Sequence, residues 1–82
     1  MGVENVLSEE KQLHVHIKHA LNLKGSSLAD IARTLNISQG SVSQVSLGRS
    51  RSKRVEGALA SALGMTPEQL FPARYSKKEG EP

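Results

Sequence analysis

The spacing of apolar residues between positions 28 and 35 is the strongest constraint on the fold. Leu28, Ile31, Ala32 and Leu35 stand at positions i, i+3, i+4 and i+7. This spacing places the four side chains on one face of an α-helix and does not fit the alternation of a strand. Similar spacing recurs along the chain, and no segment has a credible strand pattern. The sequence therefore predicts an all-α fold.

Capping residues and glycines divide the chain into five short helices. Ser8 is the expected cap of the first helix, and Lys24-Gly25 closes it. We expect one domain over residues 8–75, preceded by a flexible segment over 1–7 and followed by a disordered, charged tail over 76–82. The expected helices cover residues 9–24, 27–36, 38–47, 53–63 and 67–71.

Composition excludes several classes of protein. Hydrophobic residues make up 37% of the 82 residues, which is too many for a disordered chain. No run of about 18 apolar residues is present, so we expect no membrane-spanning helix. The absence of cysteine excludes disulfides, thiolate catalysis and zinc fingers. The first residues do not resemble a signal peptide, and we expect a cytoplasmic protein.

Residues 28–47 fit a helix-turn-helix motif, in which two short helices meet at a steep angle. Ala32 is small enough to allow the helices to approach closely, and Asn36 tolerates the left-handed backbone that the turn needs. The apolar residues expected to lock the second helix onto the first are Ile31, Leu35, Ile37, Val42 and Val45. The alternative is an ordinary helical hairpin in which the same residues serve only as core.

The outer face of the expected helix over 38–47 carries no carboxylate. Gln39, Gly40, Ser43 and Gln44 point away from the core in this interpretation. Glutamine and serine can hydrogen-bond to base edges in the major groove, and glycine permits close backbone approach. Gly40 and four serines also weaken the helix, so other contacts must hold it in place. We therefore expect these four residues to read bases in double-stranded DNA.

Positive charge is concentrated in the middle of the chain. Residues 24–54 carry a net charge of +5, whereas residues 1–23 and 55–82 each carry −1. A basic stretch next to a candidate reading helix is typical of a surface that binds phosphates. The alternative is a mobile basic loop without a partner. The expected phosphate-binding residues are Arg33, Ser38, Ser41, Arg49, Arg51, Lys53 and Arg54.

The segment from Ser27 to Tyr75 resembles the Ner/Nlp family of small helix-turn-helix regulators of transposable phages and their bacterial relatives. The resemblance is carried by Ala58-Leu59-Ala60, Ala62-Leu63, Pro67-Glu68 and Phe71-Pro72-Ala73-Arg74-Tyr75. Phe71 stands where family members typically have tryptophan. The resemblance implies a lambda-repressor-like fold and sequence-specific DNA binding in transcription regulation, with no cofactor and no catalysis. Arg74 and Tyr75 are expected to tie the carboxyl end to the core.

Other functions find little support in the sequence. His14 and His16 lie about 200° apart on a helix, and no cysteine or carboxylate completes a metal site with His16 and His19. We expect these histidines on the polar surface. No nucleophile elbow, phosphate loop or dinucleotide pattern is present, so we expect no enzyme. Too few aromatic residues are available for RNA stacking.

The leading hypothesis is a DNA-binding transcriptional regulator, a repressor by type, with no small-molecule cofactor and no membrane partner. Two copies per operator are expected, either as a homodimer or paired only on the DNA. The rival hypothesis is a helical protein-interaction module without DNA binding, which would need an exposed apolar patch. The candidate residues for such a patch are Leu7, Leu23, Leu47 and Met65.

Overall fold

The computed structural model describes residues 2–75, and for residues 2–9 it describes the backbone alone. Helices joined by short loops make up this range, which contains no strand, so the all-α prediction is confirmed. The tail predicted over 76–82 lies outside the described residues. The helices are α1 (Gly2–Leu23), α2 (Leu28–Leu35), α3 (Gln39–Ser46), α4 (Lys53–Ala62), α5 (Pro67–Leu70) and α6 (Pro72–Tyr75).

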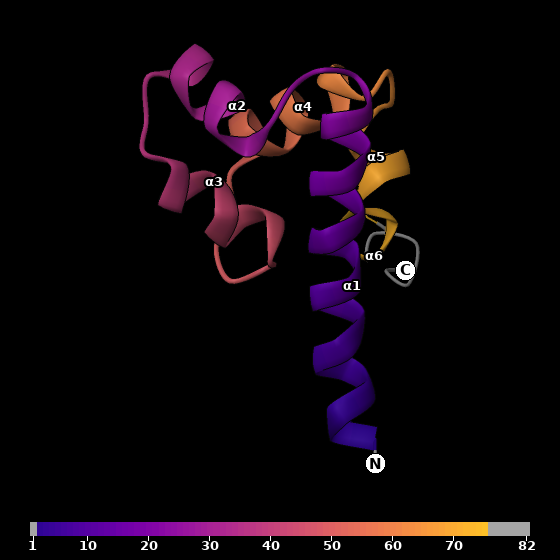
Figure 1. The fold of residues 1–82 in the computed structure, drawn as a ribbon. Coiled ribbons are helices and arrows are strands. Elements are labelled where there is room, and N and C mark those ends of the chain that lie inside the picture. The colour runs from indigo at the N-terminus through magenta and orange to yellow at the C-terminus, as the bar shows by residue number, and fades with distance from the viewer. Residues whose placement is uncertain (1, 76–82) are drawn as a thin grey trace.

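Helix α1 is the longest element, and its carboxyl-terminal half organises the domain (Figure 1). Helices α2 and α3 lie on one side of this half, and α5 and α6 lie on the other. The amino-terminal half of α1 extends beyond the other helices. Among the described residues, no helix has the length and apolar character needed to cross a membrane.

The structure corrects two expected boundaries. Helix α1 begins at Gly2, so Ser8 lies inside the helix instead of capping it, and residues 2–7 form its first turns. Residues 3–7 contain no proline or glycine that would stop a helix from extending back to this point. The last expected helix ends at residue 71, but Pro72 begins the additional helix α6. Its fixed φ suits the first position of a helix.

The core lies where α2, α3 and α4 pack together and against α1. A buried set of apolar side chains from all helices except α6 fills this space, together with the phenylalanine of the α5–α6 junction. Its members are Ile17, Leu21, Leu28, Ile31, Ala32, Val42, Val45, Val55, Leu59, Ala60, Leu70 and Phe71. The apolar faces predicted from helical spacing are therefore the ones that are buried.

The predicted helix-turn-helix is present and has the expected turn chemistry. Asn36 adopts a left-handed backbone with φ 61°, and the Ile37 N–H donates to the Ala32 carbonyl at 3.0 Å. Ala32 is buried at the crossing of α2 and α3. Ser38 then caps α3 by accepting a hydrogen bond from the Ser41 N–H at 3.1 Å. The orientation of α3 thus follows from a three-residue turn fixed at both ends.

Candidate nucleic-acid interface

Helix α3 exposes a polar face that is free of carboxylates. Among the four residues expected to read bases, Gln39, Gly40 and Gln44 are exposed, and Ser43 is half-buried. The opposite face packs Val42 and other residues into the core. Neither glutamine turns inward, so both side-chain amides are available to a ligand.

A shallow hollow lies between the beginnings of α3 and α4. Both helices are capped by serine, because Ser38 accepts from the Ser41 N–H and Ser52 accepts from the Val55 N–H. The amino ends of helices carry partial positive charge. No carboxylate lines the hollow, so its polar lining favours an anion. The lining residues are Ile37, Ser38, Gly40, Ser41, Gln44, Val45, Ser50, Arg51, Ser52, Arg54 and Val55.

The five cations expected to contact phosphate are all exposed, but they differ in their internal contacts. Arg49 and Lys53 form no ion pair with any residue between 10 and 75. Arg33 pairs with Asp30 on the surface at 3.0 Å. Arg54 donates through Nη2 to the Leu35 carbonyl at 2.7 Å and so caps the end of α2. Arg49 and Lys53 are therefore the two most available cations.

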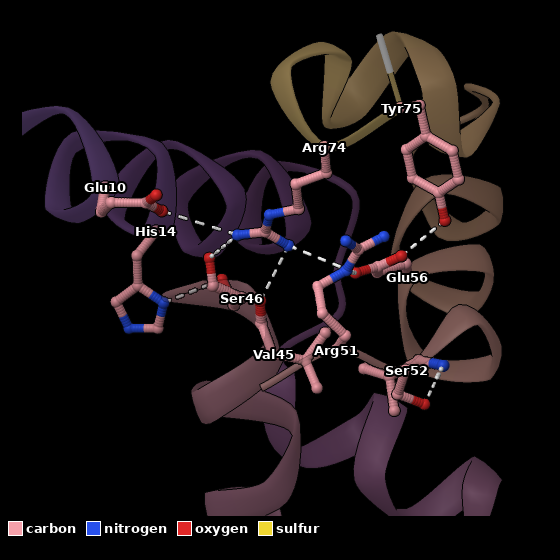
Figure 2. Close-up of polar contacts among 10 residues, drawn as sticks. Glu10, His14, Val45, Ser46, Arg51, Ser52, Glu56, Arg74 and Tyr75 are labelled. Carbon is pink, nitrogen blue, oxygen red and sulfur yellow. Dashed lines mark hydrogen bonds and ion pairs between the residues drawn. The ribbon is translucent and has the colours of Figure 1, made fainter. Parts of the chain in front are cut away.

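The fifth cation, Arg51, belongs to a cluster around a buried carboxylate that the sequence analysis missed (Figure 2). The Glu56 side chain is fully buried on α4. Its Oε2 accepts a hydrogen bond from Arg51 Nε at 2.8 Å, and its Oε1 accepts one from the Tyr75 hydroxyl. Arg74 Nη1 lies 3.6 Å from Oε2. The cluster links the loop after α3 to α4 and α6.

Electrostatics in this cluster favour a charged Glu56 and a neutral Tyr75. Burial by itself raises the pKa of the Glu56 carboxyl. Hydrogen bonds from Arg51 and Tyr75, with the charges of Arg51 and Arg74, outweigh that effect and leave the pKa below its ordinary value. The hydrogen bond to Glu56 also raises the pKa of the Tyr75 hydroxyl. Glu56 is therefore an ionised residue at neutral pH.

Arg74 on α6 binds the carboxyl end of α3 directly (Figure 2). Its Nη1 donates to the Val45 carbonyl at 2.9 Å, and its Nη2 donates to the Ser46 carbonyl at 3.2 Å. The guanidinium also lies over the Phe71 ring, 4.0 Å from its centroid, and 3.6 Å from a carboxylate oxygen of Glu10 on α1. The expectation that the Arg-Tyr pair ties the carboxyl end to the core is confirmed.

His14 also has a structural contact, which corrects its expected place on the polar surface. Its Nδ1 lies at hydrogen-bond distance, 2.8 Å, from the hydroxyl oxygen of the buried Ser46. Burial first, and the charge of Lys18 second, lower the pKa of His14. His16 and His19 are exposed. Within the described residues, no group of three potential ligands is placed to hold a metal ion.

Two polar residues at core positions carried signals in the sequence. Glu56 follows Val55 and stands three positions before Leu59, so helical spacing already places it on the buried face of α4. Ser46 lies four positions after Val42 and shares its face. A buried carboxylate needs a charged or hydrogen-bonding partner. Arg74 and Tyr75, near the end of the domain, could therefore have been proposed as partners of Glu56.

The apolar residues considered for a protein interface have different environments. Leu23 is 77% exposed, and Val15 on the same helix is 57% exposed. Both line a shallow hollow beside α1. Leu47 is half-buried, and Met65 packs against the core. The side chain of Leu7 lies outside the described residues.

Comparison with known proteins identifies a family. A family model described as winged helix-turn-helix DNA-binding matches residues 12–82. No curated protein and no solved structure matches the chain. Over residues 53–75, after the helix-turn-helix, the structure has helices α4, α5 and α6 and no β-hairpin wing.

Proposed function

Because the chain belongs to the winged helix-turn-helix DNA-binding family, we propose that it is a sequence-specific transcriptional regulator that inserts α3 into the major groove. The observation that carries this proposal is the exposed face of α3, which has hydrogen-bonding side chains and no carboxylate. An ordinary exposed helix would carry glutamate and lysine there. A carboxylate facing phosphates would oppose DNA binding.

Gln39, Gly40, Ser43 and Gln44 are the proposed base-reading residues. A glutamine amide can pair bidentately with adenine, and a serine hydroxyl can donate or accept. Ser43 is half-buried, so less of its side chain is accessible to a base than that of Gln39 or Gln44. Gly40 lies on the exposed side of the first turn of α3, where a missing side chain lets the backbone approach the DNA.

The proposed phosphate contacts fall into two groups. Arg49 and Lys53 have no internal ion pair among the described residues, so their full charge is available. Three further proposed contacts already have an internal partner, and their net contribution to binding is expected to be smaller. These are Arg33, Arg51 and Arg54. Ser38 and Ser41 complete the set, as hydroxyls at the amino end of α3.

We further propose a regulator of the Ner/Nlp type that acts as a repressor. The ending Phe71-Pro72-Ala73-Arg74-Tyr75 supports this assignment by resemblance. A reading helix of eight residues spans few base pairs, so two copies on one operator are proposed. The proposed site of action is the nucleoid.

The test begins with selection of bound duplexes from a random DNA pool. The selected sequences show both the number of half-sites and the spacing between them. Gln44→Ala is then expected to weaken binding to the selected sequence by about 1–3 kcal/mol and binding to random DNA very little. Gln12→Ala, an exposed glutamine on α1, is the matched control and should change neither. Equal losses on both DNAs would remove Gln44 from the base-reading set.

Phosphate contacts are tested by the salt dependence of binding. Lys53→Ala is expected to reduce the slope of log K against log salt by about one unit.

Failure of the wild-type chain to select any sequence would overturn the proposed function.

The exposure of Leu23 and Val15 favours one second candidate, a helical protein-interaction module. Retention on heparin or random DNA that disappears at moderate salt distinguishes the two, because a cationic surface is held by a polyanion until salt displaces it, whereas an apolar interaction surface is not held. If the chain is retained neither by a heparin column nor by a random-DNA column at low salt, the result would support the interaction module.

A further inference from the structure

The carboxyl end of helix α3 is closed by a Schellman motif. Gly48, directly after the cap residue Leu47, has a left-handed backbone with φ 84°, and its N–H donates to the Val45 carbonyl at 3.0 Å. The Arg49 N–H donates to the Gln44 carbonyl at 2.9 Å. The last turn of α3 contains no basic residue, and Gly40 and the serines reduce its intrinsic helix propensity. A contact from outside the helix can therefore add to the local cap.

Arg74 provides that external contact. Its two terminal nitrogens donate to the successive carbonyls of Val45 and Ser46, which are among the last acceptors of α3. A cation at this end also interacts favourably with the helix dipole. Because the contacts are to backbone atoms at two adjacent residues, they restrain both the position and the rotation of the helix end. We call these two hydrogen bonds to Val45 and Ser46 the Arg74 clamp.

The guanidinium is itself fixed from several directions. Glu56 on α4 and Glu10 on α1 each lie 3.6 Å from one of its nitrogens, and the Phe71 ring lies beneath it. Only 11% of the Arg74 side chain is exposed. Arg74 thus joins the end of α3 to α1, α4 and α6 through one rigid, buried group.

We propose that Arg74 is a positioning residue for sequence reading, which sets the orientation of α3 through its carboxyl end although it does not contact DNA. This inference rests on the proposed function. Gln44 precedes the clamped Val45 by one residue, so a small rotation of the helix end would displace its amide from the base it reads. Val42 is buried in the core independently of Arg74, so α3 stays attached when the clamp is lost.

The test compares Arg74→Met and Arg74→Lys with the wild-type chain on the duplex selected from the random pool. Arg74→Met is expected to weaken binding to that duplex at least about tenfold, which corresponds to about 1.4 kcal/mol. Arg74→Lys should lose less affinity, because it keeps a cation at the helix end but lacks the planar guanidinium that donates to both carbonyls. Binding to random DNA and the salt slope should not change.

Tyr75→Phe is the matched control on the same helix. It removes the hydroxyl hydrogen bond to Glu56 but leaves the contacts of Arg74 with α3 intact. It should lower thermal stability while preserving the ratio of selected-duplex to random-DNA affinity. If Arg74→Met likewise preserves that ratio, Arg74 only stabilises the fold and the proposal is overturned.

Amide hydrogen exchange gives a readout that needs no DNA. The variant measured is Arg74→Lys, because it keeps the buried positive charge and the chain is therefore expected to fold. Faster exchange at the Leu47 and Gly48 amides, with α2 unchanged, is expected. Unchanged exchange there would overturn the clamp. If the wild-type chain selects no sequence, the proposed function fails, and the exchange result alone decides whether Arg74 holds α3.

Discussion

A Gly40→Ala substitution separates the stability of α3 from its proposed use in reading DNA. Gly40 is the second residue of α3 and has a negative φ, so its backbone does not require glycine. A Cβ built at this position would meet only Ser38 Oγ, at 3.9 Å, which is ordinary van der Waals contact. The free protein therefore accommodates alanine without rearrangement.

Alanine is expected to stabilise the domain. Glycine within a helix costs about 0.5–1 kcal/mol relative to alanine, and one kcal/mol shifts Tm by about 4–8 °C in a domain of this size. Thermal unfolding followed by circular dichroism should show a Tm increase of a few degrees. DNA binding should change in the opposite direction, because the added methyl group would keep α3 from its closest approach to the groove. We expect a loss of about tenfold or more on the selected duplex.

Gly57→Ala supplies the control. Gly57 lies in the interior of α4, and a Cβ there would meet nothing within 4 Å. This variant should be stabilised by a similar or larger amount and should bind DNA like the wild-type chain. If Gly40→Ala is stabilised and binds the selected duplex with undiminished affinity, the close-approach role of Gly40 is refuted.

Three further predictions concern stability. Asn36→Ala should cost about 1–2 kcal/mol because of its left-handed backbone, whereas Asn36→Gly should not; urea unfolding distinguishes them. Glu56→Ala should cost about 3 kcal/mol or more by the same assay, because it leaves Arg74 without its buried carboxylate. Since the native pKa of His14 is lowered, stability should fall as pH drops through about 6.5, and His14→Gln should flatten this change in Tm.

Specific results would contradict these predictions. Equal unfolding free energies for Asn36→Ala and Asn36→Gly would contradict the role of the backbone angle. A Glu56→Ala variant as stable as the wild-type chain would contradict the importance of the buried carboxylate. A pH dependence of Tm that is identical with and without His14 would assign the effect to other groups.

The helix-turn-helix could be predicted because its determinants are local. The spacing of Leu28, Ile31 and Leu35 defines one helix face, and Asn36 supplies a turn that few other residues allow. These signals lie within a few positions of one another. The serine caps were only partly readable, because Ser38 lies directly before α3 and caps it, whereas Ser8, the expected cap of the first helix, lies inside α1.

The stabilising polar contacts could not be predicted from local signals. Arg74 meets Val45 across 29 positions, and His14 meets Ser46 across 32. The spacing of residues in α3 does not identify the distant residues that contact it, although its low helix propensity indicated that other contacts hold it in place. The first helix also extends farther than expected, because a possible cap at Ser8 does not end a helix when the preceding residues are helix-compatible.

The clamp on α3 also has a consequence for biosynthesis. Val45 leaves the ribosome well before Arg74, which follows it by 29 positions. A nascent chain that contains the complete helix-turn-helix but not yet α6 lacks the two hydrogen bonds from Arg74 to the end of α3. We therefore expect the end of α3 to be less restrained in growing chains until α6 has been synthesised.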